Sequence, residues 1–528
     1  MKTKIATFIL LSVVVTGQKQ TSGSFGTVTI DGKVWNQITL RPETPIWKLN
    51  IAWDLAFYFD SDGNIYDENW NFATFRNGKN TFIDKIYYLS YGRIEDPLYF
   101  KIGSLDKVNL GYKILVNDYS NMVQYPQVRN IGLNIRLNNQ YVSVQGFVND
   151  FKQNAGVLGA RLTMPKLFST PVGFTFVVDR NQYLGLKDTD EDGYPNFMDH
   201  FPSNGHYWLD SDGDGLADNH ANEYDRDGDG FPDVYDLEAI HAFWETLGQA
   251  VGQDFSNETF YDSLPDPDVT LLPTPLNIAD NSDPIAAIAV DFGYPVYAQE
   301  KMLVSIYAQA AQMLGNTVHP GNGKKLNLGF GLVPIGIASQ FGPATFNIEY
   351  RMIPNGQFEF SYWNRTYELE RAAIVTTTDK TNIISKESTL GRYGNQKGSF
   401  TKLGLKIAPY FKMSVSYQNL IGSNWNAGKG KFLTSQNQSL STSFDLIKSI
   451  SRIQYAQLFY QQRNVPHPLK FKRSESTIMG YRAGVELGSG LLLNYTFQKS
   501  FRDWDGNGNI SGSNETVNLV TIETSFTI

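Results

Sequence analysis

Residues 345–352 read TFNIEYRM, a short stretch in which polarity changes from one residue to the next. Its apolar positions are Phe346, Ile348, Tyr350 and Met352, and the polar positions between them are Asn347, Glu349 and Arg351. Successive side chains of a β-strand point to opposite faces of a sheet. The stretch therefore predicts a strand with one apolar face and one polar face.

The same alternation recurs along most of the chain, with clear examples at 131–137, 158–164 and 481–487. Many of the expected strands have about ten to thirteen residues, which is the length of a tilted strand that crosses a membrane. Aromatic residues make up 14% of the chain, and the apolar faces carry Tyr and Phe near strand ends, as in aromatic girdles. A soluble β-sandwich also alternates, so it stays as an alternative fold.

The last residues, Leu519 to Ile528, form one more alternating stretch, with Phe526 close to its end. This ending resembles that of outer-membrane proteins, whose last strand commonly closes a barrel. The resemblance and the alternation together predict an all-β fold, an antiparallel transmembrane β-barrel of about 20 strands. An inserted calcium-loop module and a short helix are expected to interrupt it.

Five segments are predicted along the chain. Met1, Lys2, Thr3 and Lys4 precede an apolar stretch, which predicts a secretory signal peptide over residues 1–20. Residues 21–45 are expected to precede the barrel, 46–183 to form its first part, 184–283 to form the insert and 284–528 to form its second part. With no cysteine in the chain, neither a disulfide nor a lipid anchor on cysteine can hold these parts.

Three aspartate ladders lie in the insert, each with acidic residues at alternate positions followed by a glycine. The first comprises Asp188, Asp190, Asp192, Gly193, Tyr194, Asn196 and Asp199. The second comprises Asp210, Asp212, Asp214, Gly215, Leu216 and Asp218, with Ala221 in its last position. The third comprises Asp225, Asp227, Asp229, Gly230, Phe231, Asp233 and Asp236.

The ladders have the spacing of calcium-binding loops. Ca²⁺ takes six to eight oxygen ligands, and carboxylates at positions 1, 3, 5 and 12 converge when Gly at position 6 turns the chain sharply. Position 7, which is Tyr194, Leu216 or Phe231, would supply its carbonyl oxygen. The run resembles thrombospondin type 3 repeats, in which such ladders stack around calcium ions. An acidic, solvated turn region without a specific ligand is the alternative interpretation.

Charge is divided unevenly along the chain. Sixteen acidic and two basic residues lie between 184 and 241, which gives this segment a net charge of −14. Because the whole chain carries −8, the remainder carries about +6, and nothing suggests binding to nucleic acid. The stripe of apolar residues from Leu237 to Val251 predicts a helix after the ladders, and residues 252–283 predict an extended linker.

The side of the membrane on which the insert lies follows from the order of the connections. Short turns are expected at 488–490, 448–451, 408–411 and 353–356, and long loops at 502–514, 464–475, 421–436 and 367–397. In outer-membrane barrels the short turns are periplasmic. Counting strands from both ends of the chain, with about eight before the insert and about twelve after it, makes the insert periplasmic.

Charged and polar residues on the predicted inner faces are candidates for the lining of the lumen. They are Asn134, Arg136, Arg161, Asn347, Glu349, Arg351, Glu359, Lys406, Arg482, Glu486 and Glu523. Rings of such residues can set the selectivity of a pore for solutes. Because the signs are balanced, they can also pair across neighbouring strands and stiffen the wall.

The preferred function is a porin-like channel or transport scaffold in the outer membrane of a Gram-negative-type bacterium, with structural Ca²⁺ in the insert. The expected partners are outer-membrane lipid, small solutes in the lumen, and a periplasmic or surface partner of the insert. The alternative is an interaction or adhesion protein, whose calcium module binds a partner or the cell wall and whose barrel is only an anchor. No catalytic motif is present, so an enzyme is not predicted.

Overall fold

The computed structural model describes residues 20–30, 33–72, 75–125, 128–167, 170–211, 215–220, 272, 274–376, 381–488, 490–503, 510–512 and 515–527. These residues fall into two units, of which the first comprises 1–185 with 283–528 and the second comprises 186–282. The limits of the second unit lie next to those expected for the insert. No helix in the described ranges is both long and apolar enough to cross a membrane.

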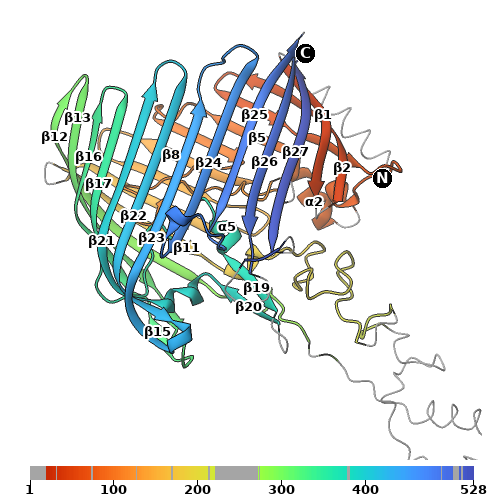
Figure 1. Ribbon diagram of the computed structural model, residues 1–528. Helices are drawn as coiled ribbons and strands as arrows, with labels where there is room; N and C mark the ends of the chain where they lie inside the picture. The colour runs from red at the N-terminus through yellow and green to blue at the C-terminus, as the bar shows by residue number, and fades with distance from the viewer. Residues whose placement is uncertain are drawn as a thin grey trace, which may run out of the picture. The chain divides into compact units, whose positions relative to one another are not determined.

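The first unit is a closed antiparallel β-barrel (Figure 1). One sheet contains 21 strands, and β3 and β4 pair in series with β2, so they share one position in a wall of 20. Pairing of β1 with β27 closes the wall. The strands are β1 (Gln20–Ile30), β2 (Lys33–Ile46), β3 (Leu49–Trp53), β4 (Leu55–Phe59), β5 (Ile86–Tyr91), β6 (Leu98–Gly103), β8 (Gly132–Asn138), β9 (Ser143–Val148), β10 (Val157–Leu167), β11 (Thr170–Asp179), β12 (Ile285–Gln299), β13 (Met302–Leu314), β16 (Phe330–Phe341), β17 (Ala344–Ile353), β21 (Tyr393–Ile407), β22 (Phe411–Asn426), β23 (Lys431–Leu446), β24 (Ile453–Val465), β25 (Ile478–Gly488), β26 (Leu491–Phe501) and β27 (Thr516–Thr527). The predicted antiparallel β-barrel of about 20 strands is confirmed.

The wall of the barrel is apolar outside and polar inside. The alternating stretch 345–352 lies in β17, and its residues Phe346, Ile348 and Tyr350 are on the exposed face. Glu349 and Arg351, which alternate with them, are 2% and 4% exposed. In β12 the outward residues Phe292 and Tyr294 are 53% and 56% exposed. This arrangement inverts that of a soluble protein, whose exposed strand residues are mostly polar.

The barrel begins earlier in the chain than the sequence suggested. Residues 21–45 were expected to precede it, but β1 and β2 pair with each other over eleven residue pairs and belong to the wall. Their alternation was missed because Gly23 and Pro42 interrupt the apolar face and Gly26 interrupts the inward face. Nine wall positions precede the insert and eleven follow it. The expected signal peptide lies outside the described residues, except for Gln20.

The connections at the two ends of the barrel differ in length (Figure 1). Those at 47–48, 300–301, 342–343 and 408–410 are tight turns, and they lie at the end where β1 begins and β27 ends. The opposite end carries the long connections, and there the chain leaves β11 for the insert and returns through β12.

This topology corrects the strand count on which the periplasmic assignment depended. The short turn at 353–356 was expected to lead into another strand before the loop at 367–397. Instead, residues 354–392 form a single long connection, and the tight turn lies at 342–343. One strand fewer reverses the parity, so the insert is attached at the end with the long connections.

Two of these connections, 104–131 and 354–392, pack against each other and against inward-facing residues of the wall, and we call their described residues the plug. The plug contains β7 (Val116–Asn117), β18 (Trp363–Asn364), α5 (Tyr367–Glu370), β19 (Ala372–Thr376), β20 (Thr381–Ser385) and η3 (Glu387–Arg392). Parallel pairing of β7 with β18 joins its two halves. The largest buried apolar cluster contains plug residues such as Trp363 and inward wall residues such as Phe147 and Val333.

The other described elements are short. They are η1 (Asp67–Trp70), α2 (Phe75–Asp84), η2 (Gln182–Gly185), β14 (Asn316–Val318), β15 (Lys325–Asn327), η4 (Ala427–Lys429) and η5 (Pro468–Lys470). The predicted helix at 237–251 and most of the predicted linker at 252–283 lie outside the described residues.

Candidate functional site

The plug is attached to the wall by buried charged groups. Arg371, from the plug, donates hydrogen bonds to Asp179 at the end of β11, with distances of 2.5 Å from Nε to Oδ2 and 2.8 Å from Nη2 to Oδ1. Both side chains are fully buried. Tyr367 donates a further hydrogen bond to Asp179. Such bidentate, charge-assisted contacts are strong and fix orientation.

The opposite side of the plug contacts β24. Arg463 pairs with Glu359 of the plug at 2.6 Å and also donates to the carbonyl oxygen of Ser361. Gln461, two residues earlier on the same face, donates to Thr366. The plug is therefore held from at least two sides of the lumen.

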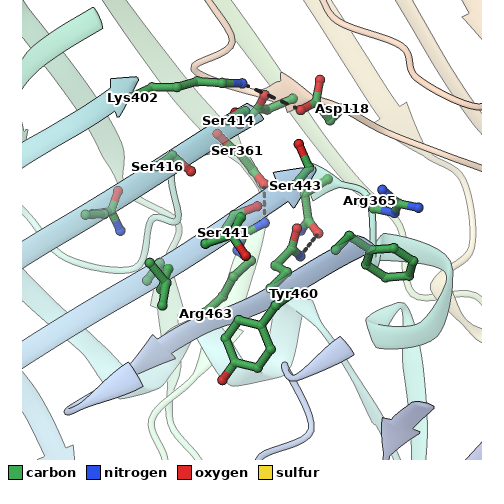
Figure 2. Close-up of a pocket in the computed structure, with 18 of the residues that line it drawn as sticks. Asp118, Ser361, Arg365, Lys402, Ser414, Ser416, Ser441, Ser443, Tyr460 and Arg463 are labelled. Atoms are coloured by element: carbon green, nitrogen blue, oxygen red, sulfur yellow. Dashed lines mark hydrogen bonds and ion pairs between the residues drawn. The ribbon is translucent and has the colours of Figure 1, made fainter. Parts of the chain in front are cut away.

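A cavity of about 430 Å³ remains between the plug and the wall formed by β21 to β25 (Figure 2). Small hydroxyl side chains line it on two neighbouring strands: Ser414 of β22 lies opposite Ser443 of β23, and Ser416 lies opposite Ser441. We call these two pairs the serine rungs. Because serine is small, its side chains leave space between this part of the wall and the plug.

Most basic residues in the lining of the cavity are paired. Lys402 lies 3.8 Å from Asp118 (Figure 2), and Lys107 lies 3.6 Å from the same side chain. Arg351 pairs with Glu349 at 2.6 Å. Arg365 and Arg482 also line the cavity, and neither forms an ion pair within the described part of the chain. Arg365 lies 4.1 Å from the ring centre of Phe459. The lining contains six basic residues and two acidic ones, Asp106 and Asp118.

The lumen charges predicted from the sequence have mixed roles. Arg161 of β10 pairs with Asp291 of β12 and crosses over β11 at Gly173, where a Cβ atom would lie 2.0 Å from its guanidinium. Glu349 pairs with Arg351, and Glu486 accepts a hydrogen bond from Gln454. These contacts agree with the wall-stiffening interpretation. Glu359 reaches the lumen from the plug, although it was expected on a strand.

The first aspartate ladder is fully described. Asp188, Asp190 and Asp192 offer carboxylate oxygens that all lie within 4.8 Å of one another. Gly193 has a φ of +95°, and its N–H donates to Asp188 at 3.0 Å. One oxygen of each of Asp190, Asp192 and Asp199 is buried without a hydrogen-bond partner among the described residues. This donor set suits a hard cation.

Burial has an electrostatic cost in this ladder. Removal from water raises the pKa of Asp188 to about 7, and the Asp192 carboxylate adds to the effect. Burial likewise raises the pKa of Asp199 to about 6, with a contribution from Asp190. A bound divalent cation would offset both the repulsion and the lost hydration.

The described part of the second ladder repeats the bonds of the first. Gly215 has a φ of +96° and donates to Asp210, as Gly193 does to Asp188. The N–H of Ser211 donates to Asp218 at 2.7 Å, as that of Thr189 does to Asn196. Asp212, Asp214 and Ala221 lie outside the described residues. So does the whole third ladder: Asp225, Asp227, Asp229, Phe231, Asp233 and Asp236.

Comparison with known proteins gives weak likenesses. No family model and no curated protein sequence matches the chain. Among solved structures, Pseudomonas aeruginosa OccK5 (OpdH) aligns with 6% identity and a TM-score of 0.34, over 96% of this chain and 97% of that one. P. aeruginosa OpdL aligns with 7% identity and a TM-score of 0.35, over 96% of each chain. Acinetobacter baumannii OccAB4 aligns with 9% identity and a TM-score of 0.31, also over 96% of each chain. Similarity at this level carries no argument about function.

Proposed function

We propose that the protein is an outer-membrane barrel that acts as a porin-like channel for small polar solutes. The observation that carries the proposal is the cavity of about 430 Å³ between the plug and the serine rungs. It lies in the lumen of a closed barrel whose exposed strand residues are apolar. The apolar exterior fits a lipid bilayer, and the narrowed lumen would select solutes by size and polarity.

The charges of the cavity favour anions. Arg365 and Arg482 have no ion-pair partner in the described ranges, so their positive charges can act on a solute in the cavity. Serine hydroxyls can donate hydrogen bonds to an oxyanion and replace part of its hydration shell. A small solute that carries a carboxylate or a similar anionic group fits this lining.

Conductance in planar bilayers tests the channel and its selectivity together. The refolded protein is expected to give discrete conductance steps, with a reversal potential in a salt gradient that indicates anion preference. The variant R365Q/R482Q should lose most of that preference, because it removes the two basic residues of the cavity that form no ion pair in the described ranges. K301Q/K448Q removes the same charge from exposed residues at the tight-turn end and should leave the reversal potential unchanged. A folded, inserted barrel without steps would contradict the channel.

We further propose that the insert binds structural Ca²⁺. The buried, unpartnered oxygens of Asp190, Asp192 and Asp199 support this, as does the repetition of the loop geometry in the second ladder. The resemblance to thrombospondin type 3 repeats supports calcium binding by the third ladder. Asp188, Asp190, Asp192 and Asp199 would hold the ion in the first loop, and the ion would neutralise their repulsion.

Limited trypsin digestion tests the calcium proposal. Lys187 and Arg226 are the basic residues between 184 and 241, so cleavage at either reports on the insert. A ligand at about 100 times its Kd stabilises the bound state by about 2.7 kcal/mol, and cleavage through local opening should slow about 100-fold. D190N/D192N should weaken this protection, whereas D280N, at an exposed insert residue outside the ladders, should keep it. Equal rates in Ca²⁺ and EGTA would contradict calcium binding.

We propose that the insert faces the exterior of the cell. Its attachment at the end with the long connections supports this, because long loops of outer-membrane barrels are external. This position also keeps the adhesion alternative open, since an external calcium module could contact a surface partner.

Cysteine labelling on intact cells tests the orientation. The chain contains no cysteine, so single substitutions give clean signals. D280C, in the insert, should react with a membrane-impermeant maleimide on intact cells. E300C, in the tight turn between β12 and β13, should react only after the outer membrane is permeabilised. The reverse pattern would place the insert in the periplasm.

A further inference from the structure

The connection 466–477, between β24 and β25, lies against the outward face of the wall. On β24 the lumen-facing side chains include Gln461 and Arg463, which contact the plug. Tyr460 and Gln462 alternate with them and so face outward. Gln462 is buried because the connection covers it, and it donates to Thr477 at 3.0 Å.

Two large apolar side chains project from this connection. Leu469 and Phe471 are 63% and 62% exposed, although Pro468 beside them is buried. The ring of Phe471 contacts that of outward-facing Tyr460, with 5.3 Å between ring centres. Leu458, one step further along the same face of β24, is 53% exposed. The apolar side chains of the connection therefore continue the apolar exterior of the barrel.

Basic side chains alternate with these apolar ones. Lys470, Lys472 and Arg473 are exposed, and none of the three forms an ion pair in the described part of the chain. The acidic residue of the connection, Glu475, accepts a hydrogen bond from the backbone of Asp503 instead. The connection thus presents apolar groups and unpaired cations on one outward surface.

We propose that this connection is a membrane-interface segment, in which Leu469 and Phe471 enter the acyl region and Lys470, Lys472 and Arg473 bind phosphate headgroups of anionic lipids. The proposal rests on the membrane location inferred above and on no property of the channel. Long basic side chains reach headgroups while nearby apolar groups stay in the acyl layer. Each cation near an anionic membrane surface strengthens attachment.

A nitroxide label on F471C in the otherwise cysteine-free chain tests the proposal in vesicles. In vesicles that contain phosphorylated anionic lipid A in phosphatidylcholine, the label should collide more with oxygen than with a water-soluble nickel chelate. G428C, in the exposed tip between β22 and β23, provides the comparison and should show the opposite preference. Equal collision patterns at the two positions would overturn the proposal.

The contribution of lipid phosphate is tested by charge removal. Adding K470Q/K472Q/R473Q to F471C should reduce the oxygen preference in lipid A vesicles to the level found in pure phosphatidylcholine. No change would overturn the phosphate contact, as would a shift produced in phosphatidylcholine by free inorganic phosphate. A barrel that inserts but does not conduct would contradict the channel and leave this test valid. A protein that fails to insert would contradict the membrane location itself.

Discussion

Replacing Asp179 with Asn is expected to increase the conductance of the barrel strongly, because it breaks the buried contact that holds the plug to β11. Asp179 accepts two hydrogen bonds from Arg371 and one from Tyr367. Removing one partner of a buried ion pair costs about 3–5 kcal/mol, since the other charge stays buried without compensation. The fraction of molecules with a displaced plug should rise by about two to three orders of magnitude, at 1.4 kcal/mol per tenfold.

Single-channel recording measures this change. D179N should show larger steps or long-lived high-conductance states, while its gel mobility with and without heating shows that the barrel is folded. D291N is the matched control, because it breaks the buried pair of Asp291 with Arg161, both of which belong to the wall. It should leave the step size nearly unchanged. Identical steps in the wild type and D179N would show that the plug does not limit conduction.

The wall of the barrel was predictable because each residue there has one of two environments. Alternation such as that of Phe346 with Glu349 and Arg351 reports directly which side faces lipid and which faces the lumen. The N-terminal strands were missed because glycines and prolines blur this two-residue period in β1 and β2. The pattern is local, and it therefore needs no knowledge of the partner strand.

The plug was not predictable in the same way. Residues 357–366 contain FEFSYW, a run that resembles a strand, yet Phe358, Phe360 and Tyr362 are buried inside the lumen. Polarity alone does not distinguish a wall strand from a connection that packs into a barrel, because both place apolar residues against a neighbour. Reading this run as a strand added one strand to the count from which the side of the insert was predicted.

The cavity could not be predicted from the sequence alone, because it is formed by tertiary contacts. One part of its lining, however, is visible as a pattern in the sequence. Ser439, Ser441 and Ser443 repeat every second residue on β23, which places small hydroxyls on a single face. That these serines line a cavity is apparent only from their pairing with Ser414 and Ser416 on β22 and from the plug opposite them. The aspartate ladders differ, because their ligands come from within twelve residues and the spacing alone carries the prediction.

Replacing Ser441 with Trp is expected to abolish most of the conductance, because the serine rungs leave the space through which solutes would pass. Ser441 lies opposite Ser416 and lines the cavity beside the plug. An indole in place of a hydroxymethyl group would occupy the gap and displace the polar lining with an apolar surface. The indole would lie between the plug and the wall. It could not move out of the gap, because Gln461 and Arg463 hold the plug there.

The neighbouring residue provides a control on the same strand. Thr442 lies opposite Val415, which is exposed on the outward face, so T442W places the same indole on the lipid side of the wall. It should retain the conductance of the wild type. If S441W conducted as well as T442W, the solute path would not follow the serine rungs. The double variant S441W/D179N shows whether the indole closes the lumen alone or only together with the plug. Displacement of the plug should restore conduction only in the second case.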